Sequence, residues 1–246
     1  SVELIKNENN QGFGAANKIG FEKAIAENYE FVFLLNQDAW ILEDTLSKMF
    51  SAISSQKFVG ILSPIHLNGK GDKLDKAFST YIDYNSNNYF LRDVLFKEQE
   101  LIYSVPFVNA ACWLVNVEVL RKVGLFDNMF FHYGEDNNFC QRTLFHGFDI
   151  AICPNSFCYH DREGVQKNLD ELEEFKRKVL VKLGDVTFDD LDTYFNDLYT
   201  NLKKESFRYL VKAKISNFKK AREKLKFLTT SKEQIEVSRI KNKENG

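Results

Sequence analysis

The stretch FVFLLNQD, residues 31–38, is an apolar run that ends abruptly in Asn36, Gln37 and Asp38. A short apolar run followed by polar residues predicts a buried strand. In open α/β sheets, ligands bind at the carboxyl ends of strands, and a carboxylate there is a suitable ligand for Mg²⁺ or Mn²⁺. Asp38 is therefore a candidate metal ligand; the alternative is that it stabilises the following turn, where Asp is common.

Outward from this strand, apolar runs alternate with helical patterns from residue 1 to about residue 158. Such alternation predicts an α/β domain with a Rossmann-like order of strands and helices. We expect strands at residues 2–5, 31–35, 58–62, 101–107, 111–115, 149–153 and 157–160. We expect helices at residues 14–26, 42–53, 117–123 and 135–145. The polar segment 66–100 has two interpretations, a β-excursion and a mobile loop, and the sequence does not decide between them.

From about Gly164 the pattern changes to long helical periods, which predicts a helical C-terminal extension over residues 164–246 after an α/β domain over residues 1–163. Its first apolar stripe, closed by Gly184, is Leu169, Leu172, Phe175, Val179, Leu180 and Leu183. A second helix is expected at residues 188–202 and a third, amphipathic and basic, at residues 205–228. The stretch after Thr230 is polar enough to predict fraying or disorder.

The composition, 44% hydrophobic and 28% charged over 246 residues, is typical of a globular protein. The apolar runs are far shorter than the roughly 20 residues that span a bilayer, and no targeting segment is recognised. We therefore expect the chain in the cytoplasm. The four cysteines, Cys112, Cys140, Cys153 and Cys158, lack the close paired spacing of a zinc site, so we expect buried, reduced thiols.

The near-neutral net charge of −2 hides a basic segment. Residues 203–226 hold ten Lys or Arg against Glu205 and Glu223, so this segment carries +8 and the remainder −10. One interpretation of the helix at residues 205–228 is peripheral contact with an anionic membrane surface; the other is packing on the catalytic domain with solvated lysines. Nucleic-acid binding is not expected, because no recognised motif accompanies the charge.

Three more segments contain candidate site residues. Glu135 and Asp136 end an aromatic run at the start of a predicted helix, where acids stabilise the helix dipole and where one can serve as a general base. His160 ends a predicted strand, and His is a common metal ligand as well as a common core residue. The loop before residue 17 has Gly12 and Gly14, which permit close approach to a phosphate or form a simple tight turn.

In their order along the chain these segments resemble family 2 glycosyltransferases, in particular the bacterial branch that includes rhamnosyltransferases and galactofuranosyltransferases. The resemblance covers about residues 1–161. It is based on NQGFGAAN (residues 10–17), LNQD (35–38), GLFD (124–127), Glu135-Asp136 with Cys140 and Arg142, and His160 after Pro154. It implies a GT-A fold, an α/β mixed sheet flanked by helices.

The resemblance also implies roles. Asp38 would bind the Mn²⁺ or Mg²⁺ that bridges the donor diphosphate, with His160 as a further ligand, while Asp136 would deprotonate the acceptor hydroxyl and Glu135 would help hold the acceptor. The residues that it implies in substrate binding are Asn10, Gly12, Asn17 and Asn36 near the nucleotide, Asn109, Ala110 and Trp113 near the sugar or acceptor, and Arg142.

The implied reaction is inverting transfer from a nucleotide-diphosphate sugar to a glycan or lipid-linked glycan in bacterial surface polysaccharide synthesis, with rhamnose the first expected donor sugar. Association into a homo-oligomer is left open. Two departures support an alternative, a catalytically degenerate glycan-binding or scaffold subunit. Asn138 stands where the family usually has an acid, and the family's usual first strands precede Ser1, which implies an incomplete nucleotide pocket in this chain.

Overall fold

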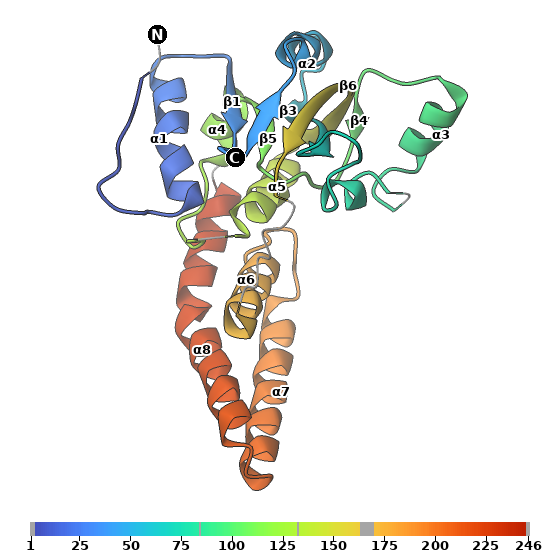
Figure 1. The fold of residues 1–246 in the computed structure, drawn as a ribbon. Helices are drawn as coiled ribbons and strands as arrows, with labels where there is room; N and C mark the ends of the chain where they lie inside the picture. Colours follow the sequence, from blue (N-terminus) through green and yellow to red (C-terminus); the bar gives the residue numbers. More distant parts are fainter. Residues whose placement is uncertain (1–2, 84, 132, 163–169, 245–246) are drawn as a thin grey trace.

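A computed structural model describes residues 3–83, 85–131, 133–162 and 170–244. Helices flank a mixed sheet on both faces, and a helical extension projects away from it (Figure 1). The strands are β1 (Phe31–Leu35), β2 (Ala39–Ile41), β3 (Val59–Asn68), β4 (Tyr103–Ser104), β5 (Cys112–Asn116) and β6 (Asp149–His160). The helices are α1 (Phe13–Ala26), α2 (Thr45–Ile53), the 3₁₀ helix η1 (Phe78–Thr80), α3 (Asn88–Phe96), α4 (Val117–Val123), α5 (Glu135–Phe145), α6 (Glu171–Leu183), α7 (Leu191–Val211) and α8 (Ile215–Glu244). The predicted α/β class is confirmed.

The order of the strands brings the end of β1 close to the end of β6. The order is β1-β5-β3-β6-β2, with β4 also paired to β6; β3 and β6 are parallel and the other pairs antiparallel. The chain turns at residues 36–38 from β1 into β2, whose Ala39 lies opposite His160. The amide of Asp161 also donates to the carbonyl of Asp38, at 2.9 Å. Asp38 and His160 are thus neighbours because of strand pairing.

The strand β6 contains a bulge. Cys153 pairs with Pro64 and Phe157 with Ile65, so residues 154–156 have no partner on β3. Upstream of the bulge β6 pairs with β4, and downstream it pairs with β2. The hydroxyl of Ser156 donates to the carbonyl of Cys153, at 3.1 Å, and stabilises the irregularity. The two strands predicted at residues 149–153 and 157–160 are therefore one bulged strand.

Each face of the sheet has its own apolar core. On one face α2 buries Met49 and Ile53 against Leu62 and Leu114. On the other, α1, α4 and α5 pack on the sheet around a group of rings, Phe21, Trp113, Phe126 and Phe139. This three-layer packing holds β1, β5 and α5 rigidly, and their ends carry the candidate site residues.

A second core joins the helical extension to the α/β domain. Its members are Met129 and Phe130 with Val179, Leu183, Phe195, Leu202, Leu225, Leu228 and Ile235. The helix α6 confirms the predicted stripe and its end at Leu183. Leu169 of that stripe and the proposed boundary at residues 163 and 164 lie outside the described residues.

The expectation of a frayed tail after Thr230 is wrong, because α8 continues to Glu244. Arg239 donates to the carbonyls of Leu183, Asp185 and Phe188. Ser238 and Asn242 both donate to the Asp127 carboxylate. Apart from Ile235, polar residues form the buried face of this part of α8, so the scarcity of apolar residues is no sign of disorder here.

The single basic helix expected at residues 205–228 is also wrong, since the chain turns within it. The helix α7 ends at Val211, Ala213 has a left-handed backbone with φ of 52°, and α8 begins at Ile215. The helix expected at residues 188–202 is the first part of α7. The two helices form a hairpin whose closed end is the part of the extension farthest from the sheet (Figure 1).

Three other predictions need correction. Residues 3–5 form no strand, because no described strand lies beside them to supply hydrogen bonds; residue 2 lies outside the described part. The strand at residues 58–62 runs on to Asn68, and the one at residues 101–107 shrinks to Tyr103–Ser104. The unassigned segment 66–100 contains the end of β3, η1 and α3.

All four cysteines are buried and none of them forms a disulfide, as predicted. Among the described helices, none has the length and apolar character needed to cross a bilayer.

Candidate active site

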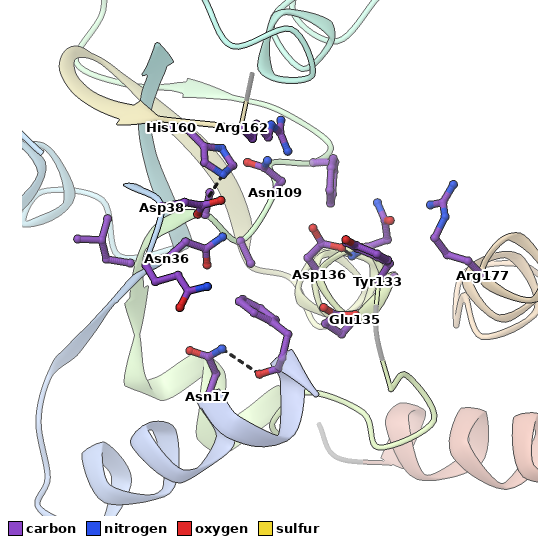
Figure 2. Close-up of a pocket in the computed structure, with 18 of the residues that line it drawn as sticks. Asn17, Asn36, Asp38, Asn109, Tyr133, Glu135, Asp136, His160, Arg162 and Arg177 are labelled. Carbon is purple, nitrogen blue, oxygen red and sulfur yellow. Dashed lines mark hydrogen bonds and ion pairs between the residues drawn. The ribbon is translucent and has the colours of Figure 1, made fainter. Parts of the chain in front are cut away.

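A cavity of about 740 Å³ opens where the ends of β1 and β6 face the first turns of α1 and α5 and one side of α6 (Figure 2). Its lining residues are Phe13, Asn17, Leu35, Asn36, Gln37, Asp38, Tyr81, Phe107, Asn109, Ala110, Ala111, Tyr133, Gly134, Glu135, Asp136, Asn137, His160, Arg162, Glu174 and Arg177. Polar side chains from both domains therefore converge on a space large enough for a small ligand.

Asp38 and His160 point toward one another at one side of the cavity (Figure 2). His160 Nε2 lies 3.5 Å from Asp38 Oδ1, and His160 Nδ1 lies 3.9 Å from Asp75 Oδ2. Burial, aided by the charge of Arg162, lowers the pKa of His160 to about 4. The imidazole is therefore neutral near pH 7 and has a lone pair available for a cation.

The buried Asp75 and the half-buried Arg162 form an ion pair beside His160. The guanidinium binds both carboxylate oxygens, at 2.8 and 2.5 Å, and the amides of Ala77 and Phe78 donate to the same carboxylate at 2.9 Å. Burial alone would raise the pKa of Asp75, but Arg162 and the Phe78 amide lower it below its usual range. Asp75 is therefore a fixed anion that holds Arg162 at the cavity wall.

Asp38 Oδ1 and His160 Nε2, at this side of the cavity, suit a divalent cation that takes few ligands from the protein. Two ligands about 2.1 Å from an octahedral ion lie about 3 Å apart, close to the 3.5 Å between Asp38 and His160. The described residues contain no cluster of three or more His, Cys, Asp or Glu suited to a metal. The pair fits a metal that takes its remaining ligands from water and substrate phosphate, as Mg²⁺ commonly does.

Glu135 and Asp136 lie across the cavity at the start of α5 (Figure 2). The preceding Gly134 has φ of 102°, and a Cβ there would lie 2.8 Å from Val181 of α6, so glycine allows α5 and α6 to approach. Burial raises the pKa of Asp136, although the Asn137 amide donates to its Oδ1 at 2.8 Å. A carboxylate with a raised pKa is better suited to accept a proton near neutral pH.

The glycine loop before α1 approaches the chain near α5. The Gly12 amide donates to Asn10 Oδ1 at 2.9 Å, and Gly12 has φ of 86°. A side chain at Gly12 would collide with the carbonyl oxygen of Phe131. Asn17 lines the cavity and donates to the carbonyl of Phe13 at 2.9 Å. Asn10 and Gly12 thus shape the loop without lining the cavity.

Asn109 and Ala110 line the cavity, and Asn109 Oδ1 is buried without a hydrogen-bond partner in the described part of the chain. Such an atom is a candidate acceptor for a ligand hydroxyl. Asn36 lines the same wall. The side chain of Trp113, by contrast, is fully buried and stacks on Phe139, so it does not line the cavity.

Arg142, which the resemblance implied in substrate binding, lies in the core instead. Its guanidinium donates to Asn138 Oδ1 at 2.9 Å and to the carbonyls of Val123 and Leu125 at 2.8 Å. Burial lowers its pKa to about 10. Asn138 in turn donates to the Gly184 carbonyl at 3.2 Å. The amide at position 138 thus joins α5 to the end of α6, and it faces the core.

Two cavity residues that the sequence did not reveal come from α6. Arg177 donates to both oxygens of Glu174, at 3.0 and 2.8 Å, and both side chains line the cavity. In sequence this is an ordinary helical i,i+3 ion pair, which gives no sign of a site. Arg162 follows His160 by two residues, and that proximity is the signal that could have identified it.

His132, in the aromatic run before Glu135, lies outside the described residues.

Comparisons with known proteins identify the family and the fold of the chain. The family model "Glycosyltransferase like family 2" matches residues 1–176. A similar solved structure is the crystal structure of GalNAc-T7 with UDP, GalNAc and Mn²⁺, at 17% identity and a TM-score of 0.54. The similarity covers 73% of this chain and 36% of that one, and at this identity it shows the fold alone. The search of curated proteins gives no match.

Proposed function

The chain belongs to the glycosyltransferase-like family 2, and from that premise we propose that it transfers a sugar from a nucleotide-diphosphate sugar to a hydroxyl of a glycan or lipid-linked glycan, with inversion. Bacterial surface polysaccharide synthesis is the setting that we propose. The observation that carries the proposal is that Asp38 and His160 line one side of a single cavity and Asp136 the other. These are the groups needed to hold a diphosphate through a cation and to remove a proton.

Asp136 acts as the general base. It accepts the proton of the acceptor hydroxyl while the hydroxyl oxygen forms a bond to the anomeric carbon. The bond from that carbon to the diphosphate oxygen breaks on the opposite face, and the nucleoside diphosphate leaves. One displacement inverts the anomeric centre. Glu135, buried beside Asp136, helps hold the acceptor.

Asp38 and His160 would hold the divalent ion, with Mn²⁺ or Mg²⁺ the candidates. When bound, such an ion supplies Lewis-acid stabilisation of the leaving diphosphate. The neutral imidazole and the Asp38 carboxylate, 3.5 Å apart, support this assignment. The presence of UDP and Mn²⁺ in the GalNAc-T7 structure is consistent with it. Arg162, held by the Asp75 carboxylate, places a guanidinium at the same wall.

We expect kcat/KM to fall as pH decreases through the raised pKa of Asp136. The base must be ionised to accept a proton, so its activity is present above that pKa and lost below it. Because burial raises the pKa, the loss should begin above the pH at which an ordinary aspartate, of pKa about 3.9, titrates. His160, of pKa about 4, stays neutral at the pH values above 4 where this loss is expected. An acid limb lying at or below pH 4 would contradict the assignment.

The proposed function is tested with a panel of nucleotide sugars, including rhamnose and galactofuranose donors, by measuring release of nucleoside diphosphate with Mn²⁺ or Mg²⁺. The protein is expressed from its complete reading frame. We expect Asp38→Ala and His160→Gln each to raise the Mn²⁺ concentration that gives half-maximal rate. The increase should be no smaller than the roughly 10–100-fold loss of metal affinity that follows mutation of a residue supporting a metal ligand. The control is Asp149→Ala, an exposed carboxylate at the other end of β6.

Unchanged metal dependence in both site variants would overturn the role of this pair. Absence of turnover with every donor would instead favour a degenerate glycan-binding subunit of the same fold.

A further inference from the structure

The hairpin tip, defined as residues 207–219 at the closed end of α7 and α8, exposes apolar side chains. Phe207, Leu210, Val211 and Ile215 are 67%, 49%, 69% and 52% exposed. The first three follow i, i+3, i+4 spacing on α7, so they form one face, and Ile215 opens α8. Between the tip and the sheet, Leu202, Leu225 and Leu228 of the hairpin are buried in the second core, while Val237 and Ile240 near the end of α8 are exposed.

The tip lies beyond the packed part of the hairpin. The last buried residues on its two sides are Ser206 and Ala221. Just behind the tip, Lys220 and Lys224 bind Glu171 of α6 at 3.0 and 2.7 Å, and these ion pairs join the first turns of α8 to α6. The tip therefore stands clear of the described part of the chain, at the end of the molecule away from the sheet (Figure 1).

The tip is also strongly basic. Residues 207–219 contain Arg208, Lys212, Lys214 and Lys219 and no acidic residue. All four side chains are exposed. A surface with this combination, apolar residues within a set of cations, matches an anionic lipid surface, where lysines meet headgroups and apolar side chains enter the acyl boundary.

We propose that the hairpin tip docks the protein on an anionic lipid bilayer, with Phe207, Val211 and Ile215 entering the interface and the basic residues contacting headgroup phosphates. A projecting tip can meet a planar bilayer without a clash from the rest of the molecule. A second copy of the chain is a less suitable partner for the tip. Two tips of charge +4 repel one another, and these few side chains bury much less surface than the roughly 800 Å² per partner of a stable interface. The proposal is independent of the sugar-transfer chemistry.

The test is co-sedimentation of the full chain with phosphatidylcholine vesicles that contain about a third phosphatidylglycerol, compared with pure phosphatidylcholine. We expect binding to the anionic vesicles, weakened by salt. Lys212→Gln/Lys214→Gln should weaken the vesicle affinity by roughly tenfold or more, and Phe207→Ser/Val211→Ser/Ile215→Ser should do so as well. Because these side chains are exposed, thermal stability and donor hydrolysis should stay at the wild-type level.

The matched control is Leu95→Ser/Phe96→Ser on α3. These apolar side chains are 73% and 68% exposed, but the surrounding residues 89–101 carry three acids against two basic residues. This variant should bind vesicles as the wild type does. As a second measurement, Phe207→Trp should shift its emission to the blue on binding. Equal loss in the α3 variant, equal binding to neutral vesicles, or dimerisation through the tip without vesicle binding would each overturn the proposal.

Discussion

Asp136→Asn should lower kcat by about 10²–10⁴-fold, the range that general base catalysis contributes, with a much smaller change in KM for the donor. The amide is nearly isosteric and keeps an oxygen for the Asn137 amide, which donates to Oδ1 at 2.8 Å. What it loses is the ability to take the acceptor proton. Removing a half-buried carboxylate whose pKa burial has raised relieves desolvation, so thermal stability should not fall. The measurement is donor turnover with acceptor present, together with a thermal melt.

The matched control is Asp197→Asn, an exposed carboxylate on α7. It makes the same chemical change outside the cavity, and we expect wild-type turnover. If Asp136→Asn kept wild-type kcat while its metal dependence was intact, another group would have to be the base. The acid limb of the pH profile should also disappear in this variant, since the titrating group is gone.

Arg142→Met should reduce stability by about 3–5 kcal/mol, because three buried oxygen acceptors lose their hydrogen-bond donor at once. The side chain keeps its apolar stem, but the carbonyls of Val123 and Leu125 and the Asn138 amide oxygen lose their donor. Each buried acceptor left without a partner costs about 1–3 kcal/mol. For a chain of this size, 3 kcal/mol corresponds to a fall in Tm of about 6–12 °C. Thermal melts and denaturant unfolding measure it.

Arg121→Met on the neighbouring helix α4 is the control. Arg121 pairs with Glu118 at 2.6 Å on the surface, and an exposed pair contributes about 0.2–1 kcal/mol. This variant should melt within a few degrees of the wild type. An Arg142→Met protein with unchanged Tm and a raised KM would return Arg142 to the substrate-binding role that the family resemblance implied.

The parts of the fold that the sequence predicted correctly have a regular apolar pattern. The strand at residues 31–35 and the helices at residues 117–123 and 135–145 match the observed bounds. The end of α8 was missed for a physical reason, since its buried face is polar: Ser238 and Asn242 bind Asp127 and Arg239 binds backbone carbonyls. Burial through hydrogen bonds leaves no apolar periodicity to detect.

The turn at residues 212–214 was missed because apolar residues continue at helical spacing through it, from Phe207 to Phe218. Only the left-handed backbone at Ala213 separates the two helices, and alanine gives no sequence signal for that conformation.

The candidate site was predictable where residues stand at the ends of strands and helices. Eight predicted site residues line the cavity: Asn17, Asn36, Asp38, Asn109, Ala110, Glu135, Asp136 and His160. Their chemical roles stay predictions. Arg177 was not predictable, because its position at the cavity depends on how α6 packs against α5, a long-range contact. The family resemblance implied Trp113 and Arg142 in substrate binding, yet neither lines the cavity. Such a resemblance does not determine which way a side chain points.

The bulge in β6 makes the chemistry of the cavity sensitive to small changes in chain length. Successive side chains of a strand point to opposite faces, so the number of residues at positions 154–156 decides which side chain ends up beside Asp38. With the upstream half of the strand fixed, deletion of Asn155 alone would turn His160 away and present a neighbour in its place. Removal of two residues would restore the face to which His160 points but would move it two positions along the strand, away from Asp38. A change of length in residues 154–156 that the bulge does not absorb would therefore separate His160 from Asp38.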